Sequence, residues 1–305
     1  MSTGNRGERV AVIGLGSMGF GMAASLLRAG YTVVGCDVIS EPVARFAAEG
    51  GLTASSAAEA AEGAAVVISV VVNAAQTEGL LFGEGGVAEV MPKGAVFVSS
   101  ATMDPDVVRR LAARLQATGR RYLDAPISGG PVRALEGRMT IMASGSEAAF
   151  AKTRPMLNAM AKTVYELGDQ PGSGAAFKMI NQLLAGVHIA AACEAISFAA
   201  KQGLDLDKVY EVITASAGNS WMFENRVPHI LAGDYRPASA IEIFVKDLGI
   251  VQDMARAARY PAPLAAAALQ MYLAAAGSGM GGDDDSSVAR VYAQLSGAKL
   301  PEPKA

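Results

Sequence analysis

A glycine pattern near the N-terminus is the feature that most restricts the fold of this chain. The stretch "GLGSMG" has the form Gly14-x-Gly16-x-x-Gly19, follows the short apolar run "RVAVI", and precedes "GFGMAASLLRAG", whose apolar residues recur at helical spacing. A strand, a glycine turn and a helix in this order begin a right-handed βαβ unit with a parallel sheet. We therefore expect an α/β fold that begins with a doubly wound (Rossmann) domain.

The alternation of strand and helix continues and then stops. The segments "YTVVGCD", "AAVVISVVV", "GAVFVSS", "RYLDAPISGG" and "MTIMASG" predict further strands. From Gly174 onward Ala-rich segments with helical spacing predict helices at about 174–202, 207–217, 240–259 and 263–276, and "GSGMGGDDDSS" predicts a flexible loop. The sequence thus predicts two domains, a doubly wound domain over residues 1–169 and an all-helical domain over 170–305.

Charge and cysteine usage exclude several classes of partner. The net charge is −3 and no basic stripe is interleaved with aromatic residues, which argues against nucleic acid. Cys36 and Cys193 lie far apart in apolar segments, without metal-ligand spacing, so we expect buried free thiols and no metal. The start "MSTGNRGER" lacks the apolar segment of a signal peptide, and Gly, Asn or charge interrupts the apolar runs. We therefore expect a cytoplasmic protein with no membrane partner.

The glycine pattern also predicts a phosphate site. Gly14 permits a tight turn, Gly16 lets the backbone approach a pyrophosphate, and the following helix presents N–H donors. Asp37 ends the second predicted strand, where an acidic residue bonds a ribose 2′-hydroxyl and repels a 2′-phosphate; no arginine follows it in "VIS". These features predict NAD in preference to NADP. The alternative is a glycine-rich turn with a helix-capping Asp.

A lysine in the first predicted helix of the second domain is the candidate catalytic group. In "GSGAAFKMINQ", Lys178, Asn181 and Gln182 are at i, i+3 and i+4 and share one helical face. Burying an ammonium is unfavourable unless it has a partner or a task. A partly desolvated lysine has a lowered pKa and can exchange a proton with a substrate hydroxyl. The alternative is a lysine whose alkyl chain covers the core while its amine reaches solvent, and helical spacing alone favours that alternative.

The stretch "DAPISGG" predicts a second polar site. Ser128 and two glycines follow a strand and a proline, which is typical of a concave backbone turn with N–H groups and a hydroxyl suited to a carboxylate. The alternative is an ordinary polar turn.

The motifs "GLGSMG", "DAPISGG" (124–130), "GSGAAFKMINQ" and "KDLG" (246–249) occur in this order along nearly the whole chain. With them the sequence resembles the β-hydroxyacid dehydrogenase family, which includes 3-hydroxyisobutyrate dehydrogenases and tartronate semialdehyde reductases. The resemblance implies that Lys178 is the general acid/base and that the protein is a homodimer or homotetramer. It implies substrate contacts from Ser128, Gly129, Gly130, Asn181 and Gln182, and cofactor contacts from Gly14, Leu15, Gly16, Ser17, Met18, Gly19, Asp37, Val72, Asn73, Thr102, Lys246 and Asp247.

Two departures from the family pattern concern the ligands. The stretch "SSATMDP" stands where the family often has Asp-x-Ser-Thr, with Ser99 and Ala101 in place of the Asp and Ser; Thr102 remains as a candidate cofactor contact. The stretch "RPASAIEIFVKDLG" puts Ser239 where many members carry a Phe that lines the pocket. A hydroxyl there suits a hydroxylated substrate, and the alternative is a neutral surface serine.

The stretches "LLAGVHIAAACEA" and "AGNSWMFENR" resemble the branch of the family that acts on four-carbon sugar acids. This resemblance implies oxidation of L-threonate at C2 to 2-oxotetronate (2-dehydro-L-erythronate). The alternatives are 3-hydroxyisobutyrate or glycerate as substrate, and, from another class, a non-catalytic dinucleotide-binding scaffold. Lys178 argues against the scaffold, which has no need for a buried amine. His188 lies at nearly the same angle on the helix but is left outside the catalytic set, because a lone helical His more often packs.

Overall fold

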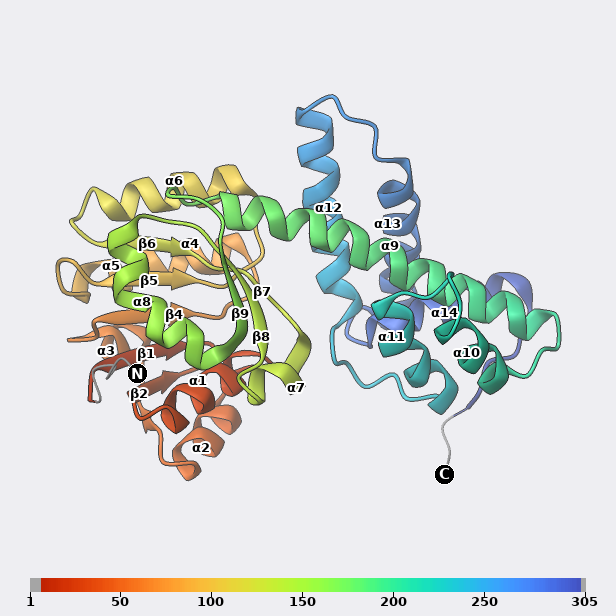
Figure 1. The fold of residues 1–305 in the computed structure, drawn as a ribbon, viewed down its shortest axis with the longest axis horizontal. Coiled ribbons are helices and arrows are strands. Elements are labelled where there is room, and N and C mark those ends of the chain that lie inside the picture. Colours follow the sequence, from red (N-terminus) through yellow and green to blue (C-terminus); the bar gives the residue numbers. More distant parts are fainter. Residues whose placement is uncertain (1–6, 303–305) are drawn as a thin grey trace. The chain divides into compact units, whose positions relative to one another are not determined.

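The computed structural model describes residues 7–302. They form two compact units, one up to Lys178 and one from Met179, and the division lies inside helix α9, Ser173–Lys201 (Figure 1). The predicted domain ranges, 1–169 and 170–305, put the division earlier, and that placement stays a prediction. The expectation of no signal peptide rests on the N-terminal stretch "MSTGNRGER". Residues 1–6 of that stretch lie outside the described residues.

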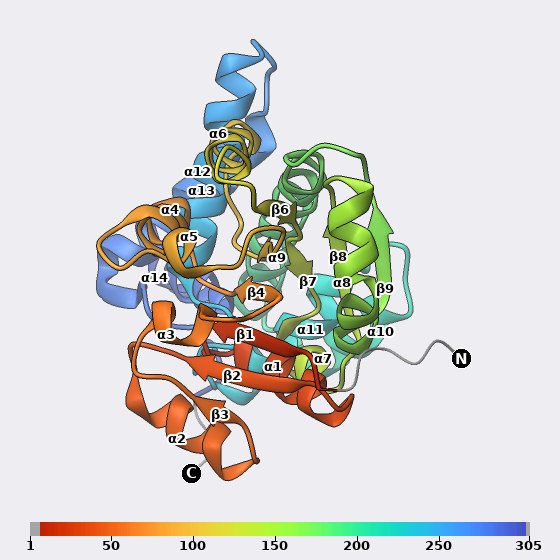
Figure 2. The same ribbon diagram turned by 90° about the vertical axis from the view of Figure 1, so that its left-hand side faces the viewer.

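The first unit is built on a parallel sheet of six strands in the order β3-β2-β1-β4-β5-β6 (Figure 2). The strand order reverses direction between β1 and β4, which is the ligand-binding point of a doubly wound fold. The predicted Rossmann fold is therefore confirmed. The strands are β1 Arg9–Ile13, β2 Thr32–Cys36, β3 Leu52–Thr53, β4 Val66–Ser69, β5 Val96–Ser99 and β6 Arg121–Asp124.

Helices cover both faces of this sheet, so the strands are apolar on both sides. Successive strand residues alternate between two apolar cores: Val96 and Val98 belong to one with Phe20, whereas Phe97 belongs to the other with Tyr122. The helices of this part are α1 Gly19–Arg28, α2 Ser40–Ala48, α3 Ala57–Ala61, α4 Ala74–Phe82, α5 Val87–Val90, α6 Pro105–Gln116, α7 Gly130–Leu135 and α8 Glu147–Met160.

The segment "MTIMASG" is a strand, as expected, but it belongs to a second sheet. That sheet has the order β7-β8-β9, from β7 Ile127–Ser128, β8 Met139–Ala143 and β9 Ala161–Glu166. β7 and β8 pair antiparallel because the chain reverses through two positive-φ glycines and the short helix α7. β9 was not predicted, since its sequence "AKTVYE" carries charges near both ends; in the structure only its first residue is buried.

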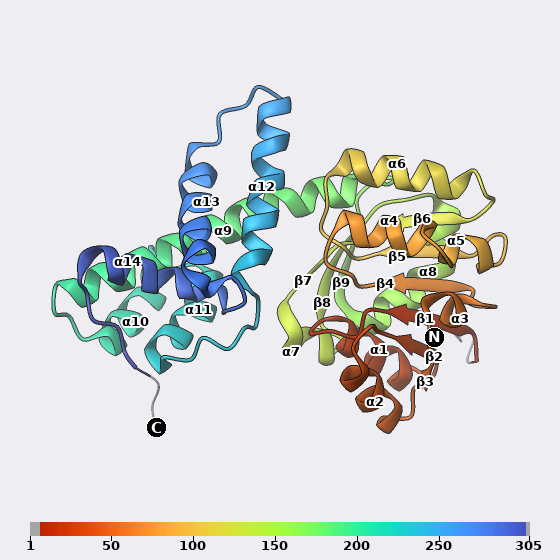
Figure 3. The ribbon, with the colours of Figure 1, turned by 180° about the vertical axis from the view of Figure 1, so that it is seen from behind.

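The second unit is helical, as predicted (Figure 3). Its core gathers Ile189 and Cys193 of α9 with Phe223, Phe244 and Tyr272. The sequence did not predict α11, whose Pro228 and polar residues weaken the helical pattern. The helices are α10 Leu206–Thr214, α11 Trp221–Ala232, α12 Ile241–Ala257, α13 Pro263–Ala275 and α14 Val288–Ser296, with a π-helical turn at Ala276–Met280 and a 3-10 turn at Asp285–Ser287.

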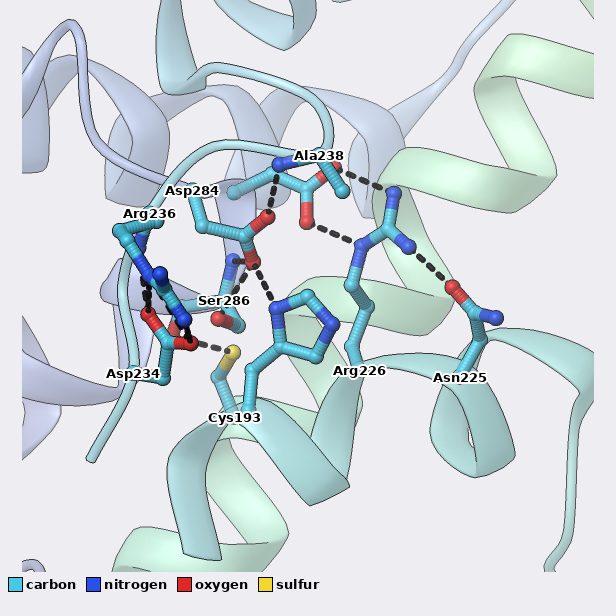
Figure 4. A network of polar contacts seen from close by, with 10 residues as sticks. Cys193, Asn225, Arg226, Asp234, Arg236, Ala238, Asp284 and Ser286 are labelled. Carbon is cyan, nitrogen blue, oxygen red and sulfur yellow. Dashed lines mark hydrogen bonds and ion pairs between the residues drawn. The ribbon is translucent and has the colours of Figure 1, made fainter. Parts of the chain in front are cut away.

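The acidic stretch before α14 was expected to be a flexible loop, and this was wrong. Asp284, Asp285 and the two serines that follow are fully buried. Arg226 donates to both oxygens of Asp285, with Nε–Oδ1 at 2.5 Å and Nη2–Oδ2 at 3.1 Å. Asp284 accepts from Ser286 Oγ at 2.6 Å and lies 3.3 Å from His229 Nδ1 (Figure 4). The stretch is ordered because a buried cation and hydrogen-bond donors surround its carboxylates.

Helix α9 corrects one further expectation. By length and composition this helix could cross a membrane, since its mean hydropathy is 1.7 over a window of 18 residues. Half of that window is buried inside the structure, and the core helix of a globular protein meets the same criteria. Length and composition alone therefore do not exclude a membrane span, contrary to the expectation from the sequence.

Candidate active site

The carboxyl ends of the central strands carry a row of polar side chains. Ser69, Ser99 and Asp124 are the last residues of β4, β5 and β6 and are aligned in register across the sheet. All three are fully buried, and they continue the line from Ile13 at the end of β1. Ligands of doubly wound sheets bind outside these strand ends. The site is therefore built from the segments that follow them.

The glycine turn after β1 has the close contacts that its sequence predicts. Gly14 has φ +92°, and a Cβ there would lie 2.7 Å from the Val70 carbonyl oxygen. A Cβ on Gly19 would lie 1.8 Å from the Gly14 carbonyl oxygen, so α1 can start only with glycine there. Gly16 is exposed and faces open space where a side chain would stand. The turn thus leaves room beside its backbone for a ligand.

The N-terminus of α1 and Asp37 border that room. Met18 caps α1 without a side-chain hydrogen bond, and the first turn holds no acidic residue. Its N–H groups and dipole suit an anion. Asp37 Oδ2 accepts from Leu15 N at 2.5 Å, and Oδ1 accepts from Ile39 N at 2.9 Å. These residues fit a dinucleotide, and the contacts of α1 with a pyrophosphate and of Asp37 with a ribose stay predictions.

The other predicted cofactor contacts follow the neighbouring strands. Val72 is about half exposed, with 48% of its surface accessible, and Asn73 caps α4. Thr102 is partly exposed, whereas Ser99 and Ser100 are buried. Of these three residues, Thr102 is thus the one whose surface is partly accessible. Contacts of these residues with a cofactor stay predictions.

The turn after β7 has two successive glycines with positive φ, +137° at Gly129 and +78° at Gly130. Ser128 ends β7 directly before them, and α7 begins at Gly130 without a side-chain cap. The carbon chain of Arg133 packs against Gly129, since a Cβ there would lie 3.0 Å from Arg133 Cδ. Successive positive-φ glycines beside a hydroxyl are compatible with an anion-binding turn, and carboxylate binding there stays a prediction.

Lys178 lies in the second turn of α9 and has only 7% of its surface exposed. This burial differs from the alternative in which the amine of a core lysine reaches solvent. A buried amine next to a glycine-rich helix start is a candidate acid/base group.

A polar network joins α9 to α12 in the second unit. Gln182 Nε2 donates to Asp247 Oδ2 at 2.5 Å, and Asn181 Nδ2 donates to Gln182 Oε1 at 2.9 Å. Lys246 Nζ pairs with the other oxygen of Asp247, whose side chain is fully buried. Asp247 therefore orients both an amide and an ammonium, a role that its sequence motif does not reveal.

Ser239 lies shortly before α12 and bonds the buried acidic stretch that precedes α14. Its hydroxyl hydrogen-bonds the buried carboxyl of Asp285, and its carbonyl accepts from Asp285 N at 2.8 Å. Its contact with substrate stays a prediction. His188 is partly exposed on α9. Within residues 7–302 no group of three or more His, Cys, Asp or Glu side chains could hold a metal ion.

Comparison with known proteins identifies the family of this chain. Residues 9–168 match the family model of the NAD binding domain of 6-phosphogluconate dehydrogenase. Residues 172–292 match the family model for NAD-binding of NADP-dependent 3-hydroxyisobutyrate dehydrogenase. The L-threonate dehydrogenase of Cupriavidus necator is 52% identical over 96% of this chain and 98% of its own length. That of Escherichia coli K12 is 47% identical over the full length of both chains.

A solved structure agrees in fold. The crystal structure of a 3-hydroxyisobutyrate dehydrogenase from Salmonella typhimurium is 49% identical, with a TM-score of 0.90 over 93% of this chain and 99% of that one. The two family models cover both domains, and the relatives match along nearly the whole chain. The family predicted from the sequence is therefore confirmed. The chain belongs to the β-hydroxyacid dehydrogenase family and is an oxidoreductase of the NAD(P)-binding hydroxyacid dehydrogenase class.

Proposed function

We propose that this protein oxidises L-threonate at C2 to 2-oxotetronate (2-dehydro-L-erythronate) with NAD as the acceptor. The observation that carries the proposal is 45–52% identity, over nearly the whole chain, to dehydrogenases named for L-threonate. The burial of Lys178 and the two positive-φ glycines of the Ser128–Gly130 turn also support the proposal.

In the proposed reaction, Lys178 Nζ accepts the proton of the substrate hydroxyl. The N–H groups of the Ser128–Gly130 turn and the amide of Asn181 hold the carboxylate, while Gln182 and Ser239 bind the remaining oxygens. NAD, when bound along the glycine turn and Asp37, supplies the hydride acceptor. A lysine acts as a base only in its neutral form, so oxidation slows as the pH falls and the ammonium form accumulates.

The substrate is tested by mixing the purified protein with NAD and, separately, L-threonate, D-threonate, D-erythronate, glycerate and 3-hydroxyisobutyrate. NADH absorbance reports turnover, and a mixture without substrate is the control. We expect kcat/KM to be highest for L-threonate by about ten-fold or more, since a site built to hydrogen-bond hydroxyls discriminates against substrates that lack one or present it in another configuration. If no substrate of the panel gives NADH, the dinucleotide-binding scaffold would be favoured.

The second candidate is oxidation of 3-hydroxyisobutyrate. The observation that favours it is the Salmonella structure, which carries that name at 49% identity. The same lysine chemistry applies, and the substrate differs in having an alkyl branch and no hydroxyl besides the one that is oxidised. A preference for 3-hydroxyisobutyrate in the panel would retain the mechanism and remove the proposed polar role of Ser239.

The preference for NAD over NADP is tested at Asp37. Replacing Asp37 with alanine is expected to weaken NAD binding by about ten-fold or more, because a hydrogen bond to a charged group contributes about 1.5–3 kcal/mol. NADP binding should change little, since the same change removes repulsion of the 2′-phosphate. Fluorescence titration with each cofactor measures the two dissociation constants.

Asp37→Asn separates support of the glycine turn from repulsion of a 2′-phosphate. Its amide oxygen can still accept from Leu15 N, but the negative charge is lost. We expect this variant to gain affinity for NADP. Asp253→Ala removes an exposed acid of α12 and is the matched control. Equal loss of NAD and NADP binding in both Asp37 variants would assign the carboxylate to support of the glycine turn alone.

A cytoplasmic homodimer or homotetramer completes the proposal. Support comes from the family resemblance and from exposed apolar side chains on α9, including Phe177, Ile180, Leu184 and Phe198. Large exposed apolar side chains on one helix are typical of a subunit contact.

A further inference from the structure

One carboxylate of the first unit bonds the start of α9, far from it in the sequence. Asp124 ends β6, is fully buried, and is not among the residues that the sequence motifs singled out for chemistry. Its Oδ2 accepts from Gly172 N at 3.0 Å and from Ala175 N at 2.8 Å. Two of the N–H groups at the beginning of α9 thus end on this single oxygen. α9 has no acidic residue of its own in its first turn, so Asp124 acts as its cap.

Ser144 makes the attachment two-sided. Its hydroxyl donates to Asp124 Oδ2 at 3.2 Å and accepts from Gly174 N at 2.9 Å. Its backbone exchanges two hydrogen bonds with that of Asp124, at 2.7 and 3.0 Å. A Cβ on Gly174 would lie 2.3 Å from the Met142 carbonyl oxygen, so the helix start is in close contact with the end of β8.

The charge of Asp124 suits this task. Burial raises the pKa of Asp124 to about 6, and the hydrogen bonds from Ala175, Gly172 and Ser144 and the charge of Arg109 oppose the rise. At neutral pH the side chain is therefore mainly an anion that only accepts hydrogen bonds. An anion at a helix N-terminus also interacts favourably with the helix dipole.

Two segments of the candidate site start from this attachment. Ala175 lies three residues, or about one turn, before Lys178, and a helix transmits the position of its first turn rigidly to the next. Directly after Asp124 in the sequence, the three residues 125–127 lead to the Ser128–Gly130 turn. A single buried carboxylate thus fixes the backbone from which both the amine and the carboxylate-binding turn project.

We propose that Asp124, assisted by Ser144, is a positioning residue of the proposed oxidation: it attaches the start of α9 to β6 and so places Lys178 relative to the Ser128–Gly130 turn. This inference rests on the proposed function of Lys178. Small displacements of a catalytic group reduce the rate steeply, by about 100-fold for 1 Å, while leaving distant ligand contacts in place.

The test compares Asp124→Ala, Asp124→Asn and Ser144→Ala with wild type in the NAD-dependent oxidation of L-threonate. We expect Asp124→Ala to reduce kcat by about 10- to 100-fold. Asp124→Asn retains an acceptor oxygen and should lie between alanine and wild type. The dissociation constant of NAD should stay within about two-fold of wild type, because the glycine turn and Asp37 do not touch this attachment. Asp205→Ala, which removes the cap of α10, is the matched control and should leave kcat unchanged.

Hydrogen exchange at the amide of Ala175 supplies a readout that does not depend on activity. Exchange should accelerate in Asp124→Ala, and an unchanged rate would overturn the attachment even if L-threonate proves not to be a substrate. A kcat within two-fold of wild type despite faster exchange would overturn the positioning role. A loss of NAD affinity in step with kcat would also overturn it, because a general loosening of the first unit would then explain both. If Asp124→Ala does not fold, Asp124→Asn and Ser144→Ala give the same comparisons.

Suppose that wild type forms no NADH with any substrate of the panel, while amide exchange at Ala175 is faster in Asp124→Ala. The proposed function and the positioning role would then be overturned, and Asp124 would still be the cap of α9. The two failures are therefore distinguishable.

Discussion

Replacing Lys178 with alanine is expected to reduce kcat for the hydroxy acid by about 1,000-fold or more, because proton transfer by a positioned side chain contributes about 10²–10⁴-fold. Affinity for NAD should stay nearly unchanged, since the glycine turn, the start of α1 and Asp37 bind the cofactor in the proposal. Steady-state kinetics and fluorescence titration with NAD measure the two quantities on one preparation. A large loss of NAD affinity, or a decrease in kcat of less than ten-fold, would count against Lys178 as the base.

Two further variants separate the proton transfer from charge and from helix stability. Lys178→Arg keeps a positive charge, but a guanidinium stays protonated and cannot act as a base, so it should be as inactive as alanine. Lys201→Ala removes an exposed lysine from the last turn of the same helix and should retain full activity. Activity in Lys178→Arg would show that charge rather than proton transfer is what this position supplies.

Replacing Arg226 with methionine is expected to lower the free energy of unfolding by about 3–5 kcal/mol, because it leaves the fully buried Asp285 without its cation. For a unit of this size the corresponding decrease in Tm is roughly 10–20 °C. The matched control is Arg236→Met, which removes an exposed partner of Asp234 and should change Tm little. Thermal unfolding followed by circular dichroism measures both variants.

The pH dependence of that loss follows from the carboxyl group. Burial raises the pKa of Asp285 to about 6 even with Arg226 present, and removal of the guanidinium raises this pKa further. A folded-state pKa above the unfolded value means that the folded state gains stability as the pH falls towards the unfolded value. The deficit of Arg226→Met should therefore be smaller at pH 5 than at pH 8. If the loss of unfolding free energy does not depend on pH, lost packing of the arginine rather than the unpaired charge of Asp285 would explain it.

The first unit could be predicted well because its signals are local. The glycine turn, the apolar strands and Asp37 lie within one βαβ unit, and each carries its own sequence pattern. The second sheet could not be predicted in the same way, since the antiparallel pairing of β7 with β8 depends on where two glycines redirect the chain. Short strands of mixed polarity give no period that identifies their partners.

The buried polar groups were the least predictable part of the molecule. Asp285 and Arg226 are separated by 59 residues, so the sequence predicts a flexible loop for an acidic run whose cation lies on another helix. Asp124 and Ala175 are separated by 51 residues, and nothing local in "DAPISGG" indicates that its first residue caps a distant helix. Such pairs become visible only when the packing brings them together.

The continuity of α9 across the division between the two units restricts how this protein can change in evolution. A shuffled gene that joined a different second unit after residue 178 would have to continue a helix in register, because no loop is available to absorb an error. Insertion of a single residue between Lys178 and Asn181 would rotate everything after it by about 100° and shift it by about 1.5 Å. Lineages of this enzyme are therefore expected to tolerate insertions in the loops around α10 and α13 and to exclude them from the first turns of α9.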